Sequence, residues 1–110
     1  MKLPNPEQAV VSLSKLRDYC LNPVHPKGRH KARVFASALG LLSDDAEFLR
    51  AILLRAVRNS EAIPTKSNVY GQMYVIDFHM SGPKGEALIR SSWIVYWGEN
   101  YPRFLSCYVI

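Results

Sequence analysis

The chain has 110 residues and a net charge of +5; 48% of its residues are hydrophobic and 21% are charged, which excludes a disordered or low-complexity protein. This length predicts a single domain, residues 1–110, with a core of its own. No apolar run approaches the roughly 20 residues that span a bilayer, and the first residues do not resemble a signal peptide. We therefore expect a protein with no membrane segment that stays in the cytoplasm, unless a separate machinery exports it.

Apolar residues recur at helical spacing through the first half of the chain. Pro23 and Pro26 end the first periodic stretch, because a proline disfavours helix at the residue before it. Gly40 is a natural C-cap for the second stretch, and Asp44 with Glu47 resembles a capping box at the start of the third. We therefore predict an extended lead-in and three helices, over residues 1–6, 7–20, 29–40 and 44–59.

The apolar period changes to two after Pro64, and the residues become rich in Val, Ile, Tyr, Phe and Trp. Helices followed by an antiparallel meander predict an α+β fold, with two or three N-terminal helices packed on a C-terminal antiparallel sheet of three to four strands. The last strand has no charge between Phe104 and Ile110 to protect its edge, so it could pair with a second copy in a homodimer or with a companion. The predicted strands are residues 69–80, 87–97 and 103–110, joined by loops at 81–85 and 98–102.

The segment from His25 to Arg33, here called the basic turn, concentrates the positive charge of the chain. It contains four of the fourteen lysines and arginines, no acid and two histidines. Basicity gathered in one turn predicts an anionic partner, either a nucleic acid or an acidic protein. The candidate binding residues in this turn are His25, Lys27, Arg29 and Arg33.

His30 and Lys31 lie four residues before Val34 and Phe35, which we assign to the core-facing stripe of the second helix. The same helix begins here, and free N–H groups at a helix N-terminus favour anions. Two interpretations remain: an inward-pointing pair in an active or phosphate-binding site, or a structural pair in which Lys31 extends to solvent and His30 bonds a carbonyl.

Strand alternation divides the sheet into two faces. The face assigned to the helices includes Ile89 and Trp93, together with Asp77. An arginine in mid-strand beside hydroxyls and phenols can hold a phosphate and stack bases, although tyrosines on a strand are also common as structural residues. The candidate residues on the other face are Tyr74, Arg90, Ser106 and Tyr108.

The sequence contains no glycine-rich phosphate loop, no dinucleotide fingerprint and no metal-ligand spacing, so we expect no cofactor and no metal. Cys20 and Cys107 are expected to be small buried hydrophobic residues. The remaining His, Lys, Arg, Ser and Tyr suit metal-independent RNA cleavage, in which the 2′-hydroxyl is the internal nucleophile. The protein then supplies an acid or base, such as histidine, and cations for the phosphorane.

The chain also carries a pattern that spans nearly its whole length, and with it the chain resembles an uncharacterised bacterial domain family. The matching residues are Leu3-Pro4-Asn5, Leu21-Asn22-Pro23, His25-Pro26, Gly28, His30-Lys31-Ala32, Tyr70-Gly71, Asp77-Phe78, Arg90-Ser91, Trp93, Pro102-Arg103 and Cys107-Tyr108-Val109. The resemblance implies a small stand-alone protein, often encoded beside a short companion gene, or the C-terminus of a larger bacterial toxin.

The order of helices and strands is also similar to the barnase, EndoU, colicin and RelE group of ribonuclease toxins. This resemblance implies that His30 and Lys31 are a catalytic pair on a helix. It implies that Arg90, Ser106 and Tyr108 are phosphate and base contacts on strands. A barnase-type glutamate base has no match, and the predicted alternation places Asp77, the acid on a central strand, on the wrong face.

Our leading hypothesis is a metal-independent endoribonuclease that acts as a bacterial toxin beside a small companion protein. His30 is then the general acid or base, with His25 as a second imidazole; Lys31 and Arg90 stabilise the phosphorane; and Tyr108 or Tyr74 stacks a base. The alternative is a non-catalytic module that binds nucleic acid or an acidic partner through the basic turn. A third possibility is a structural subunit that pairs through its last strand.

Overall fold

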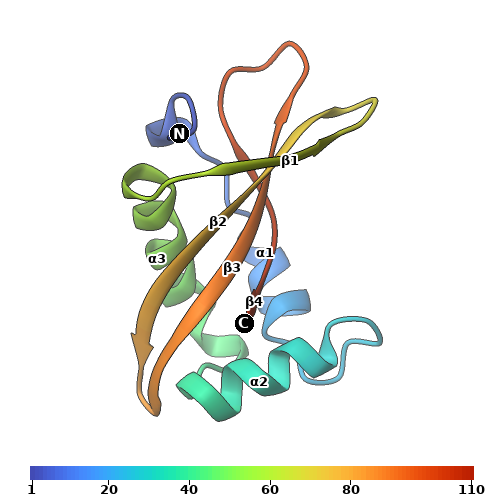
Figure 1. Ribbon diagram of the computed structural model, residues 1–110. Coiled ribbons are helices and arrows are strands. Elements are labelled where there is room, and N and C mark those ends of the chain that lie inside the picture. Colours follow the sequence, from blue (N-terminus) through green and yellow to red (C-terminus); the bar gives the residue numbers. More distant parts are fainter.

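The computed structural model describes residues 1–110, and it confirms the α+β fold with its helices before its sheet. The four strands form one antiparallel sheet in the order β1-β2-β3-β4. Figure 1 shows α3 beside the long, twisted hairpin of β2 and β3, and α2 crossing the end of the sheet where that hairpin turns. The helical elements are η1 (Pro6–Gln8), α1 (Leu13–Lys15), η2 (Leu16–Cys20), α2 (Arg29–Leu39), η3 (Ser43–Asp45) and α3 (Ala46–Asn59); the strands are β1 (Ile63–Ser67), β2 (Gly71–Gly82), β3 (Gly85–Tyr96) and β4 (Arg103–Val109).

The first helix is shorter than predicted, because it begins at Leu13 and not at Glu7. Before it, Pro6–Gln8 form the 3-10 helix η1, and Val10 is held out of any helix because it pairs with β4. The Val10 N–H donates to Pro102 O at 3.0 Å, and the Phe104 N–H donates to Val10 O at 2.9 Å. The backbone partners offered by β4 therefore override the helical pattern of this stretch.

The same segment covers part of the edge at which the sequence suggests pairing with a second copy. Val10 forms a parallel bridge with Arg103, and the Lys15 ammonium donates to Phe104 O at 3.2 Å. The beginning of the β4 edge is therefore already occupied within one chain, and the structure gives the homodimer no support.

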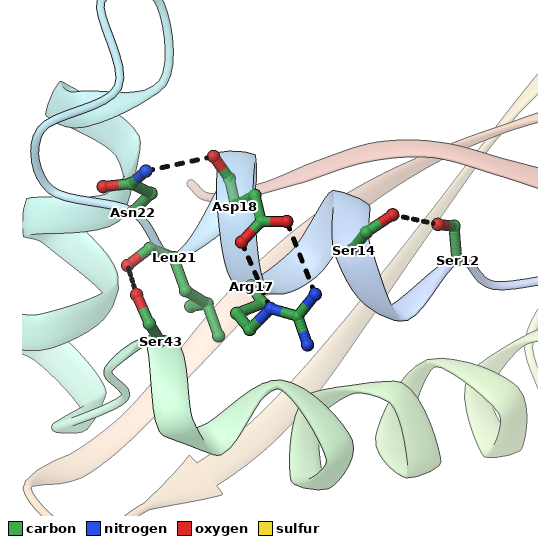
Figure 2. A network of polar contacts seen from close by, with 7 residues as sticks. All are labelled: Ser12, Ser14, Arg17, Asp18, Leu21, Asn22 and Ser43. Carbon is green, nitrogen blue, oxygen red and sulfur yellow. Dashed lines mark hydrogen bonds and ion pairs between the residues drawn. The ribbon is translucent and has the colours of Figure 1, made fainter.

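Polar contacts anchor the end of η2 just before the basic turn (Figure 2). The Asn22 amide donates to Asp18 O at 3.2 Å, and the Ser43 hydroxyl donates to Leu21 O at 3.1 Å. The second bond joins this segment to the beginning of the third helical region. The segment just before the basic turn is thus tied to both η2 and η3.

The second helix is confirmed over its predicted length. Its C-cap is Gly40, whose φ of 75° lies in the left-handed region that glycine tolerates best. The third helix begins at Ala46 after a short turn. No side chain caps α3 itself. The Asp45 carboxylate instead accepts a hydrogen bond from the Leu42 N–H at 2.8 Å and closes η3, so the predicted capping box of Asp44 and Glu47 does not form.

The three predicted strands are confirmed to within three residues at each end, and β1 is a fourth strand whose side chains are all exposed. The loop predicted at residues 81–85 is only a two-residue turn, since β2 and β3 remain paired up to Gly82 and Gly85. A side chain at Gly82 would place its Cβ 2.3 Å from Leu39 O. Glycine therefore lets the hairpin approach the end of α2 closely.

One face of the sheet is buried against the helices, where Ile76, Ile89 and Trp93 are completely inaccessible. Ser91 is the buried polar residue of this core. Its hydroxyl donates to Ile76 O at 2.8 Å and accepts a hydrogen bond from Trp93 Nε1 at 2.9 Å. The relay satisfies the buried indole N–H and joins β2 to β3.

Candidate functional site

The register of the sheet brings Asp77, Arg90 and Tyr108 into one row on the face away from the helices. Arg90 lies opposite Asp77 on β2 and opposite Tyr108 on β4. Residues directly opposite each other in antiparallel strands share a face. The predicted placement of Asp77 on the other face is therefore wrong, and an acid joins the candidate residues.

Arg90 and Asp77 form a bidentate ion pair. Arg90 Nε donates to Asp77 Oδ1 at 2.9 Å, and Nη2 donates to Oδ2 at 2.8 Å. The hydrogen bond from Arg90 lowers the pKa of Asp77, and hydrogen bonding to Asp77 and then to Tyr108 raises the pKa of Arg90. Both groups are charged at neutral pH, and the carboxylate holds the guanidinium in a fixed plane on the sheet.

Lys31 reaches this row from the first turn of α2. Its ammonium lies 4.8 Å from the centre of the Tyr108 ring, within the range of a cation–π contact. We call Lys31, Asp77, Arg90 and Tyr108 the cationic cluster. Two positive groups thus flank one phenol, while the single acid is engaged by Arg90.

His30 does not point into the core as predicted. Val34, which sits one turn further along the same side of α2, is 43% exposed, and the buried residues of the helix are Ala32, Phe35 and Leu39. The His30 side chain is exposed and makes no hydrogen bond or ion pair. It is therefore next to Lys31 in sequence but forms no hydrogen bond or ion pair with the cationic cluster in this structure.

His25 has a structural role in the basic turn. Its Nδ1 accepts hydrogen bonds from the N–H groups of Lys27 and Gly28 at 3.0 and 3.1 Å, which leaves the ring proton on Nε2. Its ring packs edge-on against Tyr19, with centroids 4.8 Å apart. A Cβ at Gly28 would lie 2.6 Å from Tyr19 O, so only glycine fits there.

The turn held in this way presents its cations to solvent. Lys27, Arg29 and Arg33 are all exposed, and none of them forms an ion pair within the chain. Their charges are therefore available to an anionic partner, close in sequence to Lys31.

Tyr74 lies on the opposite face from the cationic cluster, contrary to the prediction. It is the partner of Trp93 in the β2–β3 register and packs against the hydrophobic core. Its ring is partly buried in the layer between sheet and helices, so it cannot stack a base that also contacts Arg90.

Ser106 is on β4 but is not an exposed contact. Its hydroxyl is buried without a hydrogen-bond partner in the fold. It lies near enough to the Cys20 thiol to help lower the pKa of that thiol. Cys20 and Cys107 lie side by side in the core: a hydrogen bond from the Cys107 thiol lowers the pKa of Cys20 to about 7, and the same bond raises the pKa of Cys107. Sequence reasoning placed both cysteines in the core but did not predict that they meet.

A hollow of about 670 Å³ lies between α3 and the β2–β3 hairpin. Its floor includes Phe78 and Met80, and its rim includes Arg55, His79 and Glu86. We place the candidate site at the cationic cluster, because that cluster combines two cations with an aromatic ring, whereas the hollow has mixed charges over an apolar floor. No group of three or more His, Cys, Asp or Glu side chains is arranged to hold a metal ion.

Together, the fold and the cluster define a small α+β domain with a basic, aromatic site on the face of its sheet away from the helices. The family model described as a domain of unknown function, DUF6883, matches residues 2–110, and the chain belongs to this family. No curated protein matches the sequence. None of the helices combines the length and the apolar character that a bilayer crossing requires.

A solved structure shares the fold. It is one chain of a contact-dependent growth inhibition toxin–immunity protein complex from Klebsiella pneumoniae 342, with a TM-score of 0.69 and 16% sequence identity. The match covers 92% of this chain and 99% of that chain. At this identity the likeness shows a common fold and no more.

Proposed function

We propose that the protein is an endoribonuclease that cleaves RNA without a metal ion and acts as the toxin of a bacterial toxin–immunity pair. The observation that carries the proposal is the cationic cluster itself, where Lys31 and Arg90 flank the Tyr108 ring beside an exposed basic turn. Two cations around an aromatic ring suit a phosphate next to a base.

The reaction is an internal transesterification. The RNA 2′-hydroxyl attacks the adjacent phosphorus as a base removes its proton, and the P–O5′ bond breaks as an acid protonates the leaving oxygen. The products are a 2′,3′-cyclic phosphate and a 5′-hydroxyl. Lys31 and Arg90 offset the negative charge that the phosphorane gains, and Tyr108 stacks a base. His30, exposed on the first turn of α2, is the candidate for proton transfer.

The place in a toxin–immunity pair is supported by fold and charge together. A chain of similar fold belongs to such a complex, which contains two kinds of protein. The net charge of +5 and the unpaired cations of the basic turn suit a toxin that binds RNA, so we assign this chain the role of the toxin and not that of the immunity protein. The companion protein is then acidic, and the RNA target is in the cytoplasm of the cell that the toxin enters.

The test is cleavage of end-labelled RNA by purified protein in EDTA. We expect the wild type to release products ending in 2′,3′-cyclic phosphate, and His30→Ala and Lys31→Ala to lose about 10²-fold or more in rate, as is typical for a group that acts on the transition state. Lys84→Ala, which removes an exposed cation from the distant hairpin turn, is the matched control and should keep the activity. No cleavage by the wild type, or equal cleavage by all three variants, would refute the proposal.

A non-catalytic binding module is the second candidate, and the exposure of Lys27, Arg29 and Arg33 favours it. It predicts RNA binding that weakens steeply with salt and leaves the RNA intact. Substitution of these three residues should then reduce affinity as much as Lys31→Ala does. Filter binding at several salt concentrations, together with the cleavage assay, separates the two functions.

A further inference from the structure

Two loops lie together at the end of the sheet away from α2 (Figure 1). One joins β1 to β2 and the other joins β3 to β4. The Trp97 N–H donates to Tyr70 O at 3.0 Å, and the Trp97 indole N–H donates to Asn68 O at 2.9 Å. The two loops are therefore braced against each other.

The first loop is also fixed internally, because the Asn68 side-chain oxygen accepts hydrogen bonds from the N–H groups of Tyr70 and Gly71 at 2.8 and 3.1 Å. Even so, the side chains point to solvent: Tyr70 is 68% exposed and Trp97 is 59% exposed. We call Tyr70, Tyr96 and Trp97 the aromatic tip. Large aromatic rings that are held rigidly and remain exposed to solvent mark an interaction surface.

The charges around the aromatic tip favour an anionic ligand. Glu99 is engaged by Arg103 through two bonds of 2.9 and 3.0 Å, and the Arg103 guanidinium lies 5.3 Å from the centre of the Tyr96 ring. Lys66 on β1 is exposed and has no carboxylate partner. No free acid therefore opposes a phosphate here, and the chain as a whole is positive.

Geometry connects the aromatic tip with the cationic cluster. Tyr96 and Arg90 lie on β3 at an even separation and so share the face away from the helices. Six residues of strand span about 20 Å at 3.3 Å each. This is the length of roughly six stacked nucleotides at about 3.4 Å each.

We propose that the aromatic tip is a base-stacking surface for single-stranded nucleic acid, where a strand held at the cationic cluster makes a second contact. Every base has a face that stacks on aromatic rings, so such a surface binds without strong sequence preference. The choice of RNA as the natural strand rests on the proposed function, whereas stacking of a single strand at the tip does not.

The experiment uses Trp97 as its own reporter. Trp93 is completely buried, so a change in tryptophan fluorescence on binding reports the exposed Trp97. The probes are oligodeoxyuridylates of about 4 and about 12 nucleotides, within the site sizes that single-strand binding folds cover. They lack the 2′-hydroxyl and cannot be cleaved by the proposed route. We expect the longer probe to quench the fluorescence and to bind more tightly than the shorter one.

Variants then separate stacking from bracing. Because the Trp97 variants lack the fluorescent reporter, the affinities of all variants are measured by the fluorescence anisotropy of an end-labelled probe. Tyr70→Ala and Trp97→Ala should each weaken binding of the longer probe by about 5- to 150-fold, the range that one base–aromatic stack contributes. Trp97→Phe loses the bond to Asn68 but keeps a ring, and it should retain most of the affinity. The control is Phe48→Ala, which removes an exposed aromatic side chain from α3 and should leave binding unchanged.

Absence of quenching, or equal affinity of all variants for the longer probe, overturns the inference and assigns the aromatic tip to a protein partner. The proposed function fails separately. If the wild type binds the uncleavable probe through the tip but does not cut RNA in EDTA, base stacking is supported and the proposed catalytic function is refuted. If the wild type cuts RNA, but Tyr70→Ala and Trp97→Ala bind the longer probe as tightly as the wild type does, the catalytic function is supported and base stacking at the tip is refuted.

Discussion

Replacing Ser91 by alanine tests the polar relay that crosses the core of the sheet. The Ser91 hydroxyl accepts the Trp93 indole N–H and donates to Ile76 O, and both neighbours are completely buried. Alanine has nearly the same size, so it creates almost no cavity. The change instead leaves the indole N–H without an acceptor in a place that water does not reach.

The expected cost follows from the two bonds. A buried donor that loses its partner costs about 1–3 kcal/mol in desolvation, and the lost bond to the carbonyl contributes about 1 kcal/mol. We therefore expect Ser91→Ala to lower the free energy of unfolding by about 2–4 kcal/mol. A domain of this size has about 5–15 kcal/mol in total, so the loss is a large part of its stability.

The assay is urea unfolding followed by far-ultraviolet circular dichroism, which does not depend on the tryptophans. Ser92→Ala is the matched control, because Ser92 lies partly exposed on the other face and should change stability by less than about 0.5 kcal/mol. In a Trp93→Phe background the indole N–H is absent, so Ser91→Ala should cost clearly less there than in the wild type. An equal cost in both backgrounds would refute the relay as the source of stability.

Three further changes test other parts of the structure. The ion pair with Arg90 lowers the pKa of Asp77, so the stability that the pair contributes is fully present above the unfolded pKa of about 3.9 and is lost as pH falls through the lower folded pKa. Asp77→Asn should therefore make the urea midpoint depend less on pH in acid. An unchanged dependence would contradict the pairing. Gly82→Ala places a Cβ 2.3 Å from the last carbonyl of α2 and should lower the melting temperature by several degrees or more, measured by circular dichroism, whereas a neutral effect would mean that helix and hairpin are not in contact. The ultraviolet absorbance of the Cys20 thiolate in the folded protein should appear with a midpoint near pH 7, because the hydrogen bond from Cys107 lowers the pKa of Cys20. In Cys107→Ala this midpoint should move to higher pH. An unchanged midpoint would argue against the thiol pair.

The elements of this fold could be predicted from local pattern, but the pairing of the strands could not. The predicted alternation of inward and outward side chains agrees with the structure within β2 and within β3. The predicted alignment of the two strands, however, differs from the structure by one residue, and such a shift moves a whole strand to the other face. The register depends on the turn: pairing of Gly82 with Gly85 places Asp77 opposite Arg90. A longer loop over residues 81–85 left that register open.

The orientation of α2 shows a second limit. The sequence pattern assigns Val34 to the core-facing stripe, but the buried residues of α2 are Ala32, Phe35 and Leu39. A small residue is buried where two elements approach closely, and one sequence does not show where that occurs. The sequence pattern predicts that both Lys31 and His30 face the sheet. The structure places Lys31 against Tyr108 of β4, whereas His30 faces solvent.

Val10 and the residues around it have a consequence for the order in which the chain folds. Each strand of the sheet pairs with the next one along the chain, so the meander assembles from short-range steps. Residues 1–12, by contrast, bond to Ala62, Pro102 and Phe104, far along the chain. Long loops must close before such contacts form, which makes them late events. During synthesis this segment therefore emerges before the sheet but docks after it, once its partner strand has emerged.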